Sequence, residues 1–282
     1  MPMKPAAAEA SDLLMKLDQA ARFIRQRSQL HPAAGIVLGT GLGALAGKVK
    51  ADAVIPYKEI PNFPVSTVES HAGKLILGTL AGKPVAVLQG RFHLYEGYSA
   101  AEVAFPVRVL GHLGSSCLVV TNAAGGLNPV YAKGDMVLIE DHINFMGSGP
   151  LTGANDERVG PRFPDMCRPY SSRLAGVAMD AARELQLRLH RGVYIGVLGP
   201  NLETRAEYRM MRAWGADLVG MSSIPEVIAA VHMGIETLAL SVVTDVCDPD
   251  HLEPVNIKEI IRVANEAGPR LDQLIEAVLR KL

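Results

Sequence analysis

The chain alternates uninterrupted apolar runs with segments of helical spacing, and this alternation most constrains its fold. Runs such as "AGIVLG" (34–39), "SCLVV" (116–120) and "ETLALSVVT" (236–244) contain hardly a charged residue. A strand with one face in water alternates apolar and polar residues, whereas a strand covered on both faces is apolar throughout. The pattern therefore predicts one α/β domain over residues 1–282, with a twisted mixed β-sheet covered by helices.

Turn and capping signals divide this pattern into elements. Ala81-Gly82, between two apolar runs, predicts a hairpin turn. Ser99 followed by Glu102 indicates a capping box at the start of a helix, which Pro106 should bend or displace. The last predicted helix contains "EAGPR", and the proline there should interrupt it.

Charge and cysteine content narrow the classes of function. The net charge is −1 and the pI about 6.7, which favours neither nucleic acid nor acidic membranes as a partner. Three cysteines lie far apart without CxxC spacing, which predicts neither a disulfide framework nor a zinc site. Residues 1–30 carry charges throughout and predict an amphipathic helix, not a signal peptide. We expect a cytoplasmic protein that binds neither nucleic acid nor membrane.

Polar residues mark the carboxyl ends of the predicted strands, where ligands of α/β sheets bind. These candidate site residues are Thr40, Arg91, Asn122, Glu203, Ser222 and Asp245.

The glycine-rich segment "GTGLG" (39–43) follows a predicted strand. It resembles half of a dinucleotide fingerprint, but no acidic residue ends a second strand at the expected distance. A bare turn is another interpretation. We favour an anion-binding loop that offers backbone N–H groups and the Thr40 hydroxyl.

The segment "QGRFHLYEG" (89–97) concentrates polar side chains after another strand. In an extended segment Arg91, His93 and Tyr95 share one face. Arginine and histidine together suit an oxyanion such as phosphate, and Glu96 could orient the histidine. The alternative is an ordinary solvated turn.

Three further segments have a structural and a functional interpretation. "TNAAGGLNP" (121–129) is a tight turn or a place of close backbone approach to a ligand. Glu203 complements a helix dipole or contacts a ligand. Ser222 and Ser223 cap a helix or bind an anion. "DVCDPDH" (245–251) lacks metal-ligand spacing, so we predict no metal site.

Taken together, these segments resemble the purine nucleoside phosphorylase family, in particular the branch that assembles as trimers. The resemblance covers nearly the whole chain, and its ordered motifs are "GIVLGTGLG", "IPNFPVSTVESHAGKL", "GRFHLYEGY", "FPVRVLGHLG", "VVTNAAGGLNP", "GDMVLIEDHIN", "NDERVGPRFPDM" and "GPNLETRAEYRMMRAWGADLVGMSSIPEV". It implies phosphorolysis of purine nucleosides to free base and ribose 1-phosphate, with inorganic phosphate as co-substrate, no metal or organic cofactor, and a homotrimer.

The resemblance also implies roles for individual residues. The implied phosphate site comprises Thr40, His71, Arg91, His93, Ala123 and Ser222. The implied nucleoside site comprises Tyr95, Ala124, Gly125, Val159, Leu202, Glu203, Val219, Met221, Asp245 and Ile257, with Val159 reaching a neighbouring subunit. The implied catalytic residues are His93, Glu203 and Asp245.

Four positions depart from the members that are specific for 6-oxopurines. Asp245 stands in place of asparagine, Ile257 in place of histidine, Val159 in place of an aromatic residue and Leu202 in place of phenylalanine. Asp245 and Ile257 resemble methylthioadenosine phosphorylases instead. We therefore expect inosine and guanosine as substrates through Glu203, with adenosine accepted through Asp245. Asp245 either meets a 6-amino group as a carboxylate or donates to N7 or O6 as a protonated acid.

Other functions remain open at this point. A methylthioadenosine or methylthioinosine phosphorylase is the nearest alternative. A hydrolytic nucleosidase, a nucleoside-binding protein without catalysis and an NAD-dependent oxidoreductase are the more distant ones.

Overall fold

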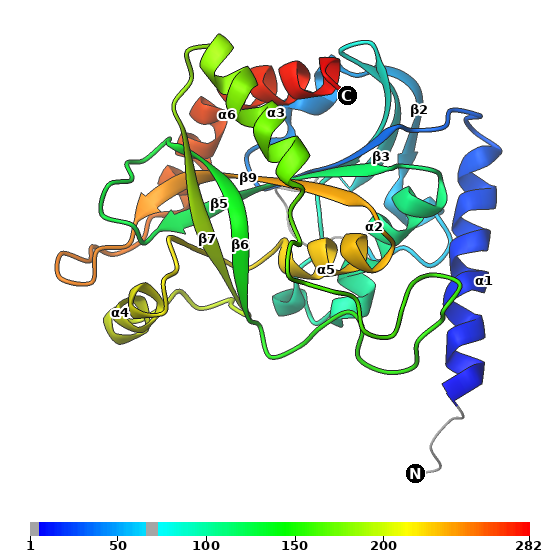
Figure 1. Ribbon diagram of the computed structural model, residues 1–282, viewed down its shortest axis with the longest axis horizontal. Coiled ribbons are helices and arrows are strands. Elements are labelled where there is room, and N and C mark those ends of the chain that lie inside the picture. Colours follow the sequence, from blue (N-terminus) through cyan, green and yellow to red (C-terminus); the bar gives the residue numbers. More distant parts are fainter. Residues whose placement is uncertain (1–5, 66–72) are drawn as a thin grey trace.

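The strands form one mixed sheet of nine strands in the computed structural model, which describes residues 6–65 and 73–282 (Figure 1). The strands are β1 Ala34–Leu38, β2 Lys50–Pro56, β3 Lys74–Leu80, β4 Lys83–Gln89, β5 Cys117–Gly126, β6 Met136–Phe145, β7 Leu189–Val197, β8 Leu218–Gly220 and β9 Glu236–Val246. Their order is β2-β3-β4-β1-β5-β8-β7-β6-β9, and β5 also pairs with β9. The mixed α/β sheet fold predicted from the sequence is confirmed.

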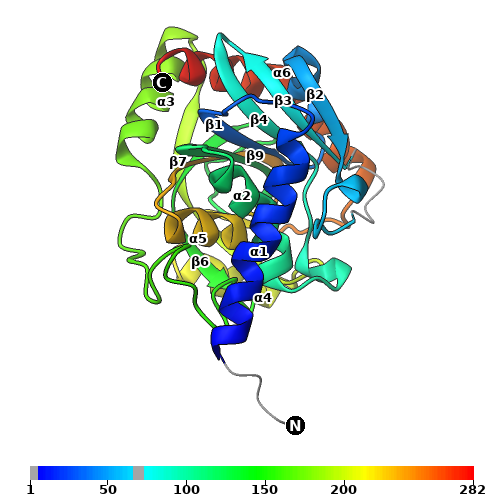
Figure 2. The ribbon, with the colours of Figure 1, turned by 90° about the vertical axis from the view of Figure 1, so that its right-hand side faces the viewer.

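Helices cover both faces of this sheet. They are α1 Ala6–Arg25, α2 Ala100–His112, α3 Ser172–Glu184, α4 Arg205–Ala213, α5 Ile224–His232 and α6 Ile257–Arg280. Helices α3 and α6 lie on one face and α2 and α5 on the other, with α1 packed along α2 (Figure 2). None of the helices within the described ranges is long and apolar enough to cross a membrane.

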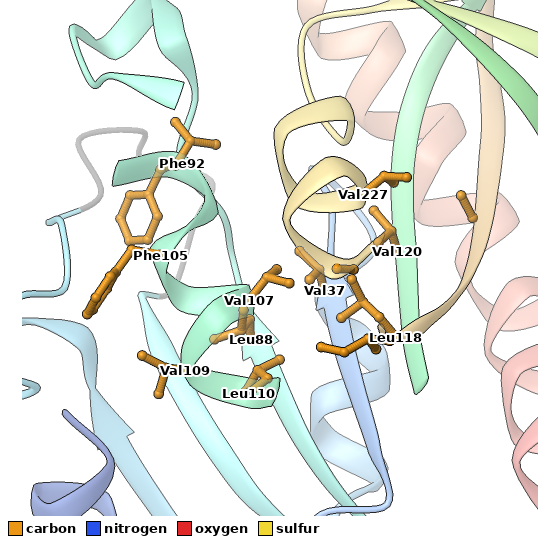
Figure 3. Packing of buried hydrophobic residues seen from close by; sticks show 14 of the residues in the cluster. Val37, Leu88, Phe92, Phe105, Val107, Val109, Leu110, Leu118, Val120 and Val227 are labelled. Carbon is orange, nitrogen blue, oxygen red and sulfur yellow. The ribbon is translucent and has the colours of Figure 1, made fainter. Parts of the chain in front are cut away.

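Each central strand contributes to two hydrophobic cores, one on each face. In β1, Val37 packs toward α2 and α5, whereas Ile36 packs toward α3 and α6. In β5, Val120 and Val119 alternate in the same way, as the two-residue period of a strand requires. Figure 3 shows Val37 and Val120 beside Val227 of α5. Burial on both faces explains the uninterrupted apolar runs.

The hairpin predicted at Ala81-Gly82 joins β3 to β4, which pair antiparallel with Leu80 opposite Lys83. Both turn residues have positive φ, 52° and 82°. This is the two-residue turn whose twist matches the flanking strands.

Two expectations about helices need correction. Helix α2 begins after Ser99 with the predicted capping box, so Pro106 does not displace its start. Helix α6 runs through Gly268 and Pro269 without interruption. Its inner face is buried on both sides of the proline, at Ala267 and Leu271, so packing outweighs the hydrogen bond that proline removes.

The segment "NAAGG" is not a turn, because β5 continues through it to Gly126. Gly125 pairs with Val219 of β8 and with Asp245 of β9. A Cβ on Gly125 would lie 2.6 Å from the Cys247 sulfur, so the approach of β9 to β5 requires glycine here. The small residues serve strand pairing at a crowded junction.

Candidate active site

A cavity of about 300 Å³ opens at the carboxyl ends of the central strands. Its lining comes from the segments after β1 and β4, from β5, β8 and β9, and from the starts of α4 and α6. The lining residues are Thr40, Arg91, His93, Tyr95, Asn122, Ala123, Ala124, Gly125, Leu202, Glu203, Tyr208, Val219, Gly220, Met221, Ser222, Thr244, Asp245, Cys247, Ile257, Ile260 and Ile261.

The cavity brings together every predicted site residue except His71 and Val159. His71 lies outside the described residues. Val159 lies in the segment between β6 and α3, where it packs against the core on the α2 and α5 side of the sheet and does not line this cavity.

The Arg91 guanidinium is buried and held by several acceptors. Its Nε donates to Glu226 Oε1 at 3.0 Å, and its Nη1 donates to the Thr121 carbonyl at 2.7 Å and to Ser222 Oγ at 3.1 Å. The side chain of Arg91 is 2% exposed and that of Glu226 is 3% exposed. Arg91 Nη2 is a buried donor for which the described part of the chain supplies no acceptor. A buried cation in this state is suited to an anionic ligand.

Two serines complete this arrangement, and they do not cap α5. Ser223 occupies the N-cap position with φ of +66° and makes no side-chain capping bond. Its hydroxyl accepts from Asn122 Nδ2 at 2.9 Å, and Ser222 Oγ accepts from Arg91. The capping interpretation is wrong because both hydroxyls are used by buried side chains next to the cavity.

His93 is oriented by Glu96, as the sequence suggested. Nδ1 of His93 lies 3.0 Å from Glu96 Oε1, and the backbone N–H of His93 donates to the same oxygen at 2.9 Å. The His93 ring stacks on Tyr95 with centroids 4.6 Å apart. Burial, together with Glu96, raises the pKa of Tyr95 to about 12, so its hydroxyl stays protonated. The interpretation as a solvated turn is wrong, since His93 is only 5% exposed.

The segment "GTGLG" is not a dinucleotide fingerprint. It leads into a short 3₁₀ helix, Gly43–Lys48, and then into β2, rather than opening the α-helix that a dinucleotide site needs. Gly41 has φ of +73°, and a Cβ there would lie 2.6 Å from that of Ala264 in α6. The glycines let the loop pass close to α6 and bring Thr40 to the cavity.

Glu203 lies just before α4 and does not cap it. Thr204 caps the helix in a box with Glu207, whose carboxylate accepts from the Thr204 N–H at 2.7 Å. Glu203 is therefore not used as a helix cap, and it lines the cavity. Burial raises the pKa of Glu203, the nearby Asp245 raises it further, and the Tyr208 hydroxyl partly opposes this rise.

Asp245 extends from the end of β9, and both of its oxygens accept hydrogen bonds. Thr244 Oγ1 donates to Oδ1 at 2.9 Å, and Cys247 Sγ donates to Oδ2 at 3.3 Å. Sequence reasoning did not single out Cys247 or Tyr208 as site residues. The two-residue period of a strand could have placed Cys247 beside Asp245, whereas nothing in the sequence around Tyr208 marked it apart from other helical residues.

No group of three potential metal-ligating side chains converges anywhere in residues 6–65 and 73–282. Within "DVCDPDH", Asp248 pairs with His251 at 2.9 Å and Asp250 pairs with Arg209 at 2.6 Å.

Comparison with known proteins agrees with this geometry. Residues 33–280 match the model of the phosphorylase superfamily. Purine nucleoside phosphorylase 1 of Geobacillus stearothermophilus is 47% identical, over 94% of this chain and 97% of that protein. The mouse purine nucleoside phosphorylase is 44% identical over 93% of each chain.

Solved structures agree as well. A crystal structure of Schistosoma mansoni purine nucleoside phosphorylase in complex with adenosine has a TM-score of 0.90 and 41% identity, over 95% of this chain and 98% of that one. A structure of isoform 2 from the same organism, in complex with cytosine and ribose-1-phosphate, has a TM-score of 0.91 and 39% identity, over 95% and 96% of the two chains. The chain therefore belongs to the phosphorylase superfamily and, within it, to the purine nucleoside phosphorylases.

Proposed function

We propose that the protein cleaves the N-glycosidic bond of purine ribonucleosides and 2′-deoxyribonucleosides with inorganic phosphate. The products are the free purine and ribose 1-phosphate or its 2′-deoxy form, as purine salvage requires. One observation carries the proposal: a single cavity holds both a set of anion-binding donors and a pair of carboxylates. Phosphate is the co-substrate, and the reaction needs no metal or organic cofactor.

The donor cluster, defined as Thr40, Arg91, His93 and Ser222, binds phosphate in this proposal. Arg91 supports the assignment most directly, because its buried Nη2 has no acceptor in the described part of the chain. The backbone at Ala123 and the side chain of His71 complete the set implied by the family motifs. Charge-assisted hydrogen bonds from arginine to phosphate are short and strong.

Phosphate held in this cluster attacks C1′ of the sugar. Departure of the purine leaves positive charge on the ribose, which the phosphate anion stabilises at close range. Tyr95, stacked on His93, and Met221 line the same cavity and contact the sugar in this proposal. His93 thus acts at the boundary between nucleophile and ribose.

Glu203 and Asp245, the carboxylate pair, recognise the purine. An ionised Glu203 accepts from N1–H of hypoxanthine or guanine, and a protonated Glu203 donates to N1 of adenine. An ionised Asp245 accepts from a 6-amino group but repels a 6-oxo group. A mismatched buried polar contact costs about 1–3 kcal/mol. The carboxylate pair therefore permits cleavage of both 6-oxopurine and 6-aminopurine nucleosides, at unequal rates. Ala124, Gly125, Leu202 and Val219 form the walls of the base site in this proposal.

Ile257 determines which substituents are accepted at C5′ of the ribose in this proposal. It lines the cavity at the first position of α6 and is 58% exposed. An isoleucine cannot hydrogen-bond a 5′-hydroxyl, so we expect weak dependence on that group. This feature is what keeps 5′-methylthioadenosine or methylthioinosine phosphorolysis as the second candidate function.

The protein acts as a homotrimer in the cytoplasm in this proposal. Val159 lies away from the cavity of its own chain, in the long segment between β6 and α3, and would complete the nucleoside site of a neighbouring copy. The cysteines are free thiols, and Cys167 is exposed, which suits a reducing compartment. Sedimentation measures the assembly, and a monomer that is fully active contradicts the role of Val159.

Base release from inosine, guanosine, adenosine and 5′-methylthioadenosine, measured in parallel with and without phosphate, tests the proposal. We expect release from inosine, guanosine and adenosine only when phosphate is present. Release without phosphate indicates a hydrolytic nucleosidase, and binding without turnover indicates a nucleoside-binding protein. Reaction of methylthioadenosine alone overturns the assigned role of Glu203, and an inert adenosine overturns that of Asp245.

A further inference from the structure

Two donors from the chain itself face the two oxygens of Asp245. Thr244 Oγ1 lies 2.9 Å from Oδ1, and Cys247 Sγ lies 3.3 Å from Oδ2. These two donors hold the Asp245 carboxylate in one orientation before any ligand is present.

The thiol of Cys247 is held in place by the sheet. Cys247 is 1% exposed, and its backbone N–H donates to the Gly126 carbonyl at 2.8 Å. Its sulfur lies over Gly125, where a Cβ would come within 2.6 Å. The sulfur therefore has little freedom to turn away from Asp245.

The direction of the hydrogen bond follows from the state of the thiol. Burial and the Asp245 carboxylate raise the pKa of the Cys247 thiol well above its usual range, so the thiol keeps its proton. A thiol sulfur is only a weak acceptor, whereas a carboxylate oxygen is a strong one, so the thiol proton lies between Sγ and Oδ2 and is donated to the carboxylate.

We infer that Cys247 is a specificity-determining positioning residue, which orients the Asp245 carboxylate as an acceptor for a 6-amino group. This inference rests on the proposed function. The purine 6-amino group donates two hydrogens, whereas a 6-oxo group only accepts. The thiol thus favours adenosine over inosine without touching either nucleoside.

Glu203 distinguishes the same two purine classes through its hydrogen bond to N1. An aminopurine offers a donor at its 6 position and an acceptor at N1, which fits an ionised Asp245 beside a protonated Glu203. A 6-oxopurine offers the opposite pattern and fits an ionised Glu203. Burial raises the pKa of Glu203, which favours the protonated form that N1 of adenine requires.

The test compares kcat/KM for adenosine and for inosine in Cys247→Val and Cys247→Ser. Valine removes the donor and keeps an apolar side chain, one heavy atom larger than cysteine. We expect the adenosine-to-inosine ratio to fall by about tenfold, the typical effect of one lost hydrogen bond to a charged group. Serine restores a donor, and we expect a ratio within about threefold of the parent protein. Cys117→Val, in the buried start of β5, is the matched control and leaves the ratio unchanged.

Each outcome decides the matter. A ratio unchanged in a folded Cys247→Val overturns the inference alone, and so does a serine variant that loses the ratio as valine does, because shape rather than donation is then responsible. Loss of both activities by an equal factor indicates a merely structural role and also overturns it. A parent protein without phosphate-dependent turnover overturns the proposed function and this inference together. Thermal unfolding of each variant verifies the fold, with Cys247→Ala as a smaller replacement.

Discussion

The donor cluster and the carboxylate pair share a cavity but are built differently. Arg91, His93 and Ser222 are at most 8% exposed, and Arg91 and Ser222 bond to each other. Glu203 is only half-buried, and its neighbour Leu202 is 40% exposed. The donor cluster lies after the ends of central strands and just before α5, whereas the carboxylate pair lies just before α4 and near the end of β9.

This difference fits the chemistry of the two proposed ligands, phosphate and purine. In the proposed reaction phosphate is the same in every turnover, so a rigid, preorganised set of donors would serve it without reorganisation. The purine varies at its 6 position, and proton placement on two carboxylates can follow it where fixed donors cannot. Variants of the donor cluster should therefore change kcat/KM by the same factor for every nucleoside. Variants of the carboxylate pair should change the ratio of kcat/KM between inosine and adenosine.

The largest effect is expected from Arg91→Lys. Lysine keeps the charge but cannot contact Glu226, Ser222 and a ligand through one planar group. We expect kcat/KM to fall by about 10²–10³ for inosine and adenosine alike, as when one preorganised donor is lost.

Arg191→Lys is the matched control, because Arg191 pairs with Glu140 on the surface. Steady-state kinetics with varied phosphate measures the effect. A variant that changes the inosine-to-adenosine ratio would break the proposed division between the two clusters.

Glu203→Gln tests the carboxylate pair and should have the next largest effect. Glutamine can donate to N1 of adenine but loses the negative charge that accepts N1–H of a 6-oxopurine. We expect inosine kcat/KM to fall by about 10–100-fold and adenosine kcat/KM to fall much less. Glu207→Gln at the α4 cap is the control, and equal losses for both nucleosides would contradict the role of Glu203.

The two clusters also differ in how far the sequence predicted them. The donor cluster lies where apolar runs end, and the order of strands brings such ends together, so Arg91, His93 and Ser222 were predictable. The same rule singled out Glu203 and Asp245, and the family motifs added their proposed role toward the purine. Cys247 escaped prediction because the role inferred for it depends on how β9 approaches Gly125, a tertiary contact.

The fold shows the same limit. Strands buried on both faces were predicted correctly, and so was the hairpin at Ala81-Gly82. Strand β2, at the edge of the sheet, was not predicted because most of its residues are exposed and it lacks an apolar run. The continuations of β5 through "NAAGG" and of α6 through Pro269 were missed, because local propensity there yields to strand pairing and to burial.

The pH dependence of the free energy of unfolding should also report on the carboxylate pair, through Glu203. Because burial raises the folded-state pKa of Glu203, ionising it costs more in the folded than in the unfolded chain. Its contribution to stability is therefore most favourable below the unfolded pKa and declines as pH rises through the folded pKa. Urea unfolding from pH 4 to 8 measures this, and Glu203→Gln should flatten the decline and stabilise the protein at neutral pH. A steeper decline in the variant would contradict the sign of the shift.

The smallest effect is expected at the 5′ position, where the cavity meets solvent. Ile257→Asn offers a hydrogen-bonding group to a 5′-hydroxyl and removes an apolar contact for a 5′-methylthio group. At a position 58% exposed, one such contact changes rates by only about two- to fivefold. We expect inosine to gain and 5′-methylthioadenosine to lose by that factor, measured as kcat/KM, whereas Val130→Asn, at an exposed position away from the cavity, changes neither. Because Ile257 lies outside the donor cluster, its substitution should leave the KM for phosphate unchanged. A shift in that KM would show that the donor cluster is coupled to the part of the cavity that binds the nucleoside.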